Sequence, residues 1–215
     1  MRVKEIAGRW RPFSYAFIVL ALETLGLSSA RAQGGLTPQE ANVVRAQAAA
    51  IAAEDLYDHG EADKAIEQWQ EAVRLDPGLT RAHHDLGLAL RDKKRLDEAI
   101  THLREAVRLD PRNASARADL GDALQEKGDL DGAFLEYRSA VNLVPGSAPL
   151  RSNLGYLLVR KGDLDGAMTE WREATRLDDK YAPPYANLGE ALESKGDKPG
   201  AIAAYEKFLK LVPGA

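Results

Sequence analysis

A spacing of 34 residues runs through most of this chain and constrains its fold more than any other feature. Of five positions spaced 34 residues apart, four are proline, at Pro77, Pro111, Pro145 and Pro213, and the remaining one is Asp179. A Leu-Gly pair recurs in phase, at Leu86-Gly87, Leu120-Gly121, Leu154-Gly155 and Leu188-Gly189. A single alanine recurs at Ala65, Ala99, Ala133, Ala167 and Ala201, and a large apolar residue stands four residues after each. Such self-similarity predicts a stack of units that bury their cores only against their neighbours.

The repeated pattern resembles that of the tetratricopeptide repeat (TPR) family, whose units are helix–turn–helix pairs. If the 34 places of each repeat are numbered so that the proline stands in the thirty-second, the repeats begin at Ala46, Thr80, Ala114, Ala148 and Ala182. The resemblance implies an all-α fold, an α-solenoid of about five TPR units forming a right-handed superhelical array. The expected repeats lie near residues 37–79, 80–113, 114–147, 148–181 and 182–215.

Each repeated position has a physical reason. Glycine and alanine, such as Gly87 and Ala99, are small enough to let the two helices of a repeat cross closely. A proline such as Pro111 ends the second helix because its ring removes a hydrogen-bond donor. We expect Gly60, Gly128, Gly162 and Gly196 to end first helices, and Asp129, Asp163 and Asp197 to cap second helices. Thr37-Pro38-Gln39-Glu40 reads as a capping box that starts a longer first helix.

The N-terminus has the layout of a secretory signal peptide. A basic start is followed by an apolar run from Phe13 to Leu22 and by the small-residue site Ala30-Arg31-Ala32, which predicts cleavage after Ala32. Residues 1–32 are therefore interpreted as a signal peptide and residues 33–36 as a flexible lead, and the product is expected to be periplasmic or secreted. The alternative is an uncleaved anchor, but a spanning helix needs about 20 apolar residues and Glu23 interrupts this run.

Composition and motifs argue against several classes of function. The chain has 33 acids and 29 bases; residues 1–32 hold two of the acids and five of the bases, so cleavage leaves 31 against 24. This acidic balance argues against nucleic-acid binding, and no membrane contact is expected after cleavage. There is no cysteine, and none of the common hydrolase, metalloprotease or phosphate-binding motifs occurs. We expect a non-enzyme without cofactor or metal, in which His83 of the His83-His84 pair is structural.

The TPR resemblance also indicates where a partner would bind. In such arrays the first helices line a concave groove, which here would carry Arg81, His84, Asp85, Arg91, Asp119, Asp122, Asn153, Tyr156, Arg160, Asn187 and Glu190. Asp92, Glu126 and Glu193 fall on the same face, so that seven acids stand against three arginines. Because a concave surface focuses its field, we expect a protein or peptide partner with a basic or neutral extended segment.

Two known TPR binding patterns can be compared with this groove. Some arrays use a clamp of basic residues to bind the C-terminal carboxylate of a partner. This chain lacks those residues whichever of its first three repeats is taken as the start of the pattern. An asparagine ladder, which holds a peptide backbone because an amide both donates and accepts, is half present at Asn153 and Asn187, whereas Asp85 and Asp119 occupy the other two rungs. A solvated polar face explains the same residues equally well.

Three functions remain open from the sequence. The first is a protein-binding module or adaptor of the cell envelope or exported compartment, and the second is a structural spacer or assembly subunit that works through the ends of the array. The third is the TPR portion of a larger enzyme. The apolar end near Phe208, Leu209 and Leu211 is either a tolerated exposed edge or a contact surface.

The signal-peptide interpretation makes a direct prediction. Mass spectrometry of the protein from the envelope fraction of its own cell should find Gln33 at the N-terminus. An intact segment from Met1 to Leu27 in the membrane pellet would show instead that the signal is retained as an anchor.

Overall fold

The computed structural model describes residues 37–213, so the predicted signal peptide and flexible lead fall outside the described residues. This described part consists of ten α-helices and contains no β-strand, which confirms the all-α fold. The helices are α3 (Pro38–Asp58), α4 (Ala62–Leu75), α5 (Thr80–Asp92), α6 (Leu96–Leu109), α7 (Ala114–Lys127), α8 (Leu130–Leu143), α9 (Ala148–Arg160), α10 (Leu164–Leu177), α11 (Pro183–Ser194) and α12 (Lys198–Leu211). None of them has the length and apolar character needed to cross a membrane.

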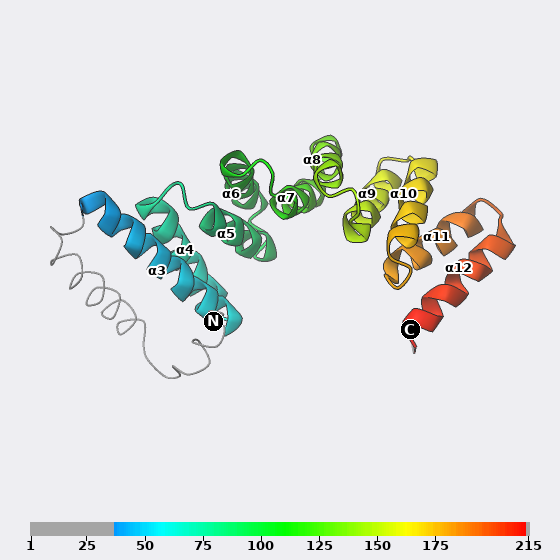
Figure 1. Ribbon diagram of the computed structural model, residues 1–215, viewed down its shortest axis with the longest axis horizontal. Helices are drawn as coiled ribbons and strands as arrows, with labels where there is room; N and C mark the ends of the chain where they lie inside the picture. The colour runs from blue at the N-terminus through cyan, green and yellow to red at the C-terminus, as the bar shows by residue number, and fades with distance from the viewer. Residues whose placement is uncertain (1–36, 214–215) are drawn as a thin grey trace. The chain divides into compact units, whose positions relative to one another are not determined.

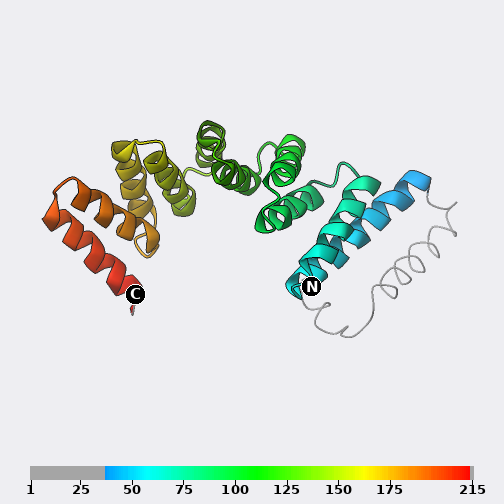
Figure 2. The ribbon, with the colours of Figure 1, turned by 180° about the vertical axis from the view of Figure 1, so that it is seen from behind.

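The chain divides into two compact bodies, which are described separately. Of the described residues, the first body contains α3, α4 and α5 and ends at Lys93, and the second begins at Lys94 and contains α6 to α12. Within each body every helix packs on the next one along the chain, as Figures 1 and 2 show from opposite sides. In the second body the first helices are α7, α9 and α11, and the second helices are α6, α8, α10 and α12.

The helix ends follow the predicted chemistry. Gly60, Gly128, Gly162 and Gly196 all have positive φ, between 80° and 93°, a conformation in which glycine meets no penalty. Lys94 takes the corresponding position in the second repeat, with φ of 61°. The side chains of Asp129, Asp163 and Asp197 accept hydrogen bonds from backbone N–H groups at the starts of α8, α10 and α12. The predicted stop and start signals are therefore confirmed.

Helix α3 is longer than the other helices, as its sequence predicts. The capping box forms in full: Thr37 Oγ1 accepts from the Glu40 N–H, and Glu40 Oε2 accepts from the Thr37 N–H at 2.7 Å. Alanines fill its buried side, namely Ala46, Ala48, Ala49, Ala50 and Ala53. This small-residue face replaces the Leu-Gly pair of the later repeats and lets α4 pack closely against α3.

Small residues lie where paired helices cross, and their partner is an aromatic ring. A Cβ added at Gly121 would stand 3.2 Å from the Tyr137 ring, and one added at Gly155 would stand 2.5 Å from the Trp171 indole nitrogen. Gly189 meets Tyr205 in the same way. In these three repeats the glycine of the first helix therefore accommodates the aromatic residue that stands four places after the recurring alanine of the second helix.

A further repeated contact ties each first helix to the turn before it. In four repeats the fourth residue reaches the backbone carbonyl oxygen six residues earlier: His83 Nε2 lies 3.2 Å from that of Pro77, and Arg117 Nε donates to that of Pro111 at 3.0 Å. The pairs Arg151 with Pro145 and Tyr185 with Asp179 repeat the arrangement. The structural role predicted for His83 is confirmed, and its imidazole belongs to this series.

Successive repeats are also joined by ion pairs that sequence analysis missed. In α4, α6, α8 and α10 an aspartate in the first turn pairs with a lysine at the end of the next first helix, in Asp63–Lys93 (2.6 Å), Asp97–Lys127, Asp131–Lys161 and Asp165–Lys195. Both residue types recur every 34 residues, so the signal was present in the sequence. Because the aspartates are largely exposed, each pair is worth only about 0–1 kcal/mol.

The helix crossings predict a graded response to Gly→Ala substitution. Alanine gains roughly 1 kcal/mol of helix propensity over glycine, whereas overpacking typically costs about 1–3 kcal/mol. At Gly155 the clash is with Trp171, which is only 3% exposed and is held by a 3.1 Å hydrogen bond from its Nε1–H to the Ser152 carbonyl. We expect Gly155→Ala to destabilise the protein most, Gly189→Ala less because Tyr205 is partly exposed, and Gly121→Ala to be near neutral.

Chemical denaturation followed by circular dichroism measures these differences. Gly146→Ala is the control, since a Cβ at Gly146 meets no atom within 4 Å. Equal losses of stability at the three helix crossings would contradict this account of the packing.

Candidate protein-binding face

The candidate site lies on the first helices, and in each body the surface that these helices form is here called the first-helix face. In the first body α3 and α5 contribute to it, and in the second body α7, α9 and α11 do. Helices α9 and α11 contact each other directly, so residues of both helices belong to one region of the second body. This region holds five of the predicted groove residues, namely Asn153, Tyr156, Arg160, Asn187 and Glu190.

Two asparagines and an exposed apolar pair distinguish the α9–α11 region. Asn153 and Tyr156 stand three residues apart on α9, which places them on one side of the helix. Tyr156 is 53% exposed and Val159 is 41% exposed. Among residues 37–213, the side chains of Asn153 and Asn187 form no hydrogen bond. Both amides are therefore available to donate to and accept from a bound chain.

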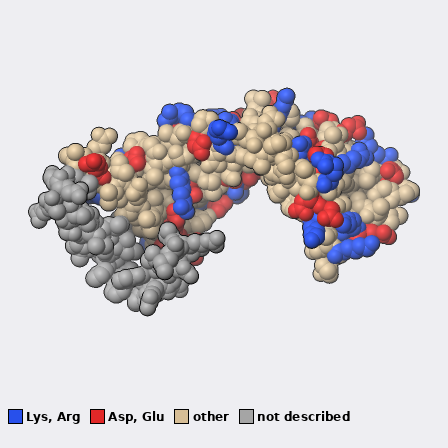
Figure 3. All heavy atoms as spheres, viewed as in Figure 1, with Lys and Arg blue, Asp and Glu red and all other residues tan. Residues whose placement is uncertain are grey.

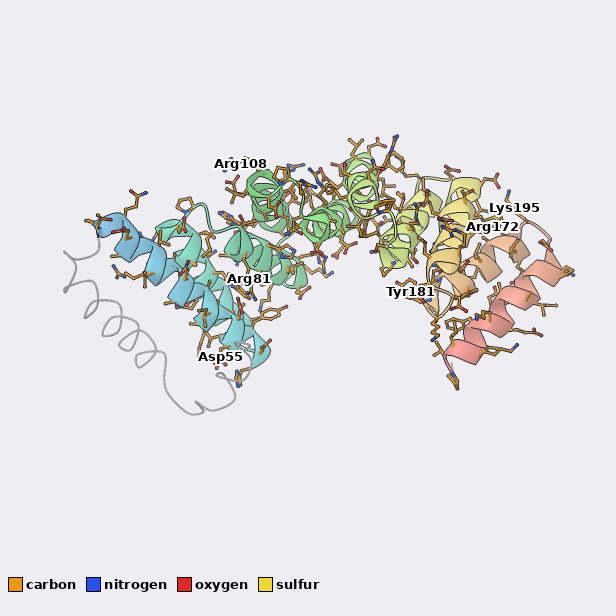
Figure 4. The ribbon with its side chains drawn as sticks, viewed as in Figure 1. Asp55, Arg81, Arg108, Arg172, Tyr181 and Lys195 are labelled. Carbon is orange, nitrogen blue, oxygen red and sulfur yellow. The ribbon has the colours of Figure 1, made fainter. Side chains whose placement is uncertain are left out.

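The first body shows a different arrangement on α5, in which the charges are already paired. Arg81 Nη2 lies 3.0 Å from Glu54 Oε2 on α3, and Arg81 Nε lies 3.4 Å from Asp85 Oδ2. Figure 4 labels Arg81 on α5. Burial raises the pKa of both Glu54 and Asp85, and the positive charge of Arg81 opposes that rise. The predicted site residue His84 stands beside Asp85, with Nδ1 3.7 Å from Oδ1. Sequence analysis did not predict Glu54 as the partner of Arg81.

Several acids of the predicted groove serve the structure by accepting hydrogen bonds from tyrosine. Asp122 accepts from the hydroxyl of Tyr137, whose ring is buried at the α7–α8 crossing. Glu193 accepts from Tyr205 at 3.2 Å, and Asp92 accepts from Tyr57. The bond from Tyr57 to Asp92, with burial as a second cause, raises the pKa of Tyr57 to about 12. These carboxylates therefore contribute less to a free negative field than their number suggests.

The remaining predicted residues differ in how available they are. Arg160 donates from Nη1 to the Gln125 carbonyl at 3.2 Å, which joins α9 to α7. Arg91 and Asp119 are half-buried, and neither is free of contacts. Glu190 is exposed on α11. Between residues 37 and 213 no three side chains of histidine, aspartate or glutamate are grouped as a metal site would require.

Family models and solved structures agree with this architecture. A TPR repeat model matches residues 53–90, 87–128 and 155–196, and a tetratricopeptide repeat model matches residues 182–213. The chain belongs to the tetratricopeptide repeat family. A search of the curated proteins gave no significant match.

Several solved TPR structures resemble this TPR protein at low sequence identity, which shows a shared fold only. The MamA protein has a TM-score of 0.71 at 23% identity, over 78% of this chain and 91% of its own. YrrB, described as a TPR protein with an unusual peptide-binding site, has a TM-score of 0.65 at 23% identity, over 78% and 86%. PilF of Pseudomonas aeruginosa has a TM-score of 0.71 at 19% identity, over 81% and 80%.

The bonding pattern on the first-helix face predicts which residues can change without loss of stability. Asn153→Ala and Asn187→Ala should alter the free energy of unfolding by less than about 0.5 kcal/mol, since they remove no hydrogen bond. Asp122→Ala should cost about 1–3 kcal/mol, because it takes a hydrogen-bond partner from the buried Tyr137 hydroxyl.

Denaturant titration of the single variants and of Asp122→Ala combined with Tyr137→Phe would test this difference. The double variant removes donor and acceptor together and should recover part of the loss. A cost at Asn153 equal to that at Asp122 would contradict the division between free and structural polar groups.

Proposed function

We propose that this TPR protein is a non-catalytic adaptor that binds an extended segment of a partner protein on its first-helix face. The observation that carries the proposal is the pair of unbonded amides, Asn153 and Asn187, beside the exposed side chains of Tyr156 and Val159. An extended peptide presents N–H and C=O groups along its length, and an amide side chain can satisfy both. The fold likeness to YrrB, described as having an unusual peptide-binding site, supports peptide binding as such.

The chemistry of the face favours a neutral or basic segment. Glu190 is exposed on α11 beside the two asparagines, and the predicted groove carries more acids than arginines. Tyr156 offers an amphipathic ring to an apolar side chain of the segment. Because exposed charges are screened by salt, affinity for a basic segment should fall as ionic strength rises. The acids that accept from tyrosine limit this effect.

We also propose that the protein acts in the cell envelope or another exported compartment. The basic start, the short apolar run and the Ala-Arg-Ala site of residues 1–32 support this location. The predicted N-terminus of the mature protein at Gln33 provides its test, as described above.

One observation favours the alternative of an assembly subunit or spacer that works through the ends of the array. Ile202 on α12 is 59% exposed, whereas three of its four equivalents, Ile66, Ile100 and Met168, are at most 4% exposed, and the fourth, Phe134, is partly buried. Leu209, also on α12, is 50% exposed. Within the described residues no helix covers this apolar side of α12, so it is available for a contact with another molecule.

Peptide titration tests the adaptor function. The probes are fluorescein-labelled extended peptides of equal length, with lysine, uncharged or glutamate residues around one leucine. The lysine and uncharged peptides should bind more tightly than the glutamate peptide. Loss of a neutral hydrogen bond is worth about 0.5–1.5 kcal/mol, so Asn153→Ala and Asn187→Ala should each weaken binding roughly 2- to 10-fold. Tyr156→Ala should weaken it at least as much, because aromatic residues dominate such contacts.

Thr101→Ala, on the second helix α6, is the matched control and should leave anisotropy titrations unchanged. Asn153→Ala, Asn187→Ala and Tyr156→Ala could instead bind the peptides as the wild type does, while Ile202→Ser and Leu209→Ser abolish association with the natural partner. That result would contradict the adaptor function and support the spacer function.

A further inference from the structure

A basic stripe runs along the second helices α6, α8 and α10 of the second body, on elements that the proposed peptide site does not use. It is defined by Arg104 and Arg108 on α6, Leu135 and Arg138 on α8, and Arg172 and Arg176 on α10. Arg104, Arg138 and Arg172 occupy the same place in three successive repeats, so the stacking of the repeats sets them in register. Figure 4 labels Arg108 and Arg172, which belong to the first and last helices of the stripe.

The three arginines in register have no partner of their own. Among the described residues, the guanidinium groups of Arg104, Arg138 and Arg172 form neither an ion pair nor a hydrogen bond, although all three residues are exposed. Arg108 and Arg176 are instead held by Glu105 and Glu173, with N···O distances of 2.6–2.8 Å. Five arginines against two glutamates leave the stripe with three uncompensated positive charges, in a chain whose formal net charge is −4.

The middle of the stripe is apolar and the α10 end is hollowed. Leu135 stands one helical turn before Arg138 and is 61% exposed. At positions where α6 and α10 carry a glutamate and a second arginine, α8 carries Ser139 and Asn142. A depression of about 550 Å³ beside Arg172 is lined by Arg151, Thr169, Glu170, Glu173 and Arg176. Figure 3 shows basic and acidic side chains interspersed on the surface of the second body.

We propose that this stripe binds an acidic segment of a second protein, with an apolar side chain of that segment on Leu135 and its carboxylates on Arg104, Arg138 and Arg172. A planar guanidinium pairs with carboxylates in a two-point geometry. A protein segment fits better than an anionic lipid surface, because the same helices also expose Asp97, Asp131 and Asp165, each already paired with a lysine of the next repeat. A flat lipid surface would have to cover these neutralised pairs as well as the arginines, whereas a single segment can follow the arginines alone.

This site takes ligands of the opposite charge to the proposed first-helix site, so the protein would hold two different segments at once. The two proposals can fail separately, since they use different helices and different residues. Tyr156→Ala and Asn153→Ala should weaken the basic or neutral peptides and leave acidic peptides bound as before.

Anisotropy titration of the mature protein tests the stripe. The probes are a fluorescein-labelled glutamate-rich peptide with one central leucine, the same peptide with serine in place of leucine, and vesicles of phosphatidylcholine with or without phosphatidylglycerol. Exposed ion pairs contribute about 0.2–1 kcal/mol each, so the triple variant Arg104→Gln, Arg138→Gln, Arg172→Gln should bind the leucine peptide several-fold to about 100-fold more weakly. Its dependence on salt should flatten, and Leu135→Ser should weaken the leucine peptide alone.

Arg112→Gln is the matched control. Arg112 is an exposed arginine of the same body whose guanidinium is likewise unbonded within the described part of the chain, and it lies in the turn before α7. A loss for Arg112→Gln equal to that for Arg138→Gln would mean that net charge alone is responsible and would overturn the proposal. Absence of saturable binding to the acidic peptides, or preferential binding to phosphatidylglycerol vesicles that the triple variant loses, would also overturn it.

Discussion

The close crossing of the two helices within a repeat is the contact on which the rest of this structure depends. At Gly121, Gly155 and Gly189 the backbone of a first helix lies against an aromatic ring of the second helix, at distances that leave little or no room for a methyl group. A repeat protein has no central core, so each helix pair must bury its apolar surface locally. The Gly–aromatic contact makes this possible, because it brings two helices close enough for a single layer of side chains to fill the space between them.

The polar contacts of the array follow from the same packing. Once the helix pairs are set, the fourth residue of a repeat lies next to the carbonyl of the preceding turn, and His83, Arg117, Arg151 and Tyr185 all use that carbonyl. The aspartate–lysine pairs between neighbouring repeats have the same origin. Each of these contacts is weak when taken alone, but the same contacts recur from one repeat to the next.

In every repeat the same positions hold the residues that pack the helices and join the repeats. Residues that bind a partner can therefore vary only at the remaining positions. On the first helices these include Asn153, Tyr156 and Asn187, and on the second helices they include Arg104, Arg138 and Arg172. Two surfaces of different chemistry arise in this way on one scaffold without any change in the fold. If both proposals hold, this separation would let one small TPR protein join two partners through residues that the helix crossings do not use.

The sequence by itself determined the helical repeat, the ends of the helices and the small residues at their crossings, because each of these depends on local chemistry that recurs every 34 residues. It also placed Asn153, Tyr156 and Asn187 on one face. Only the tertiary structure decided which polar groups on that face are free. Asp122 accepts from Tyr137, Arg81 pairs with Glu54, and Asn153 has no partner in the described residues. The physical reason is that each partner comes from a different helix, and its distance depends on how the helices pack.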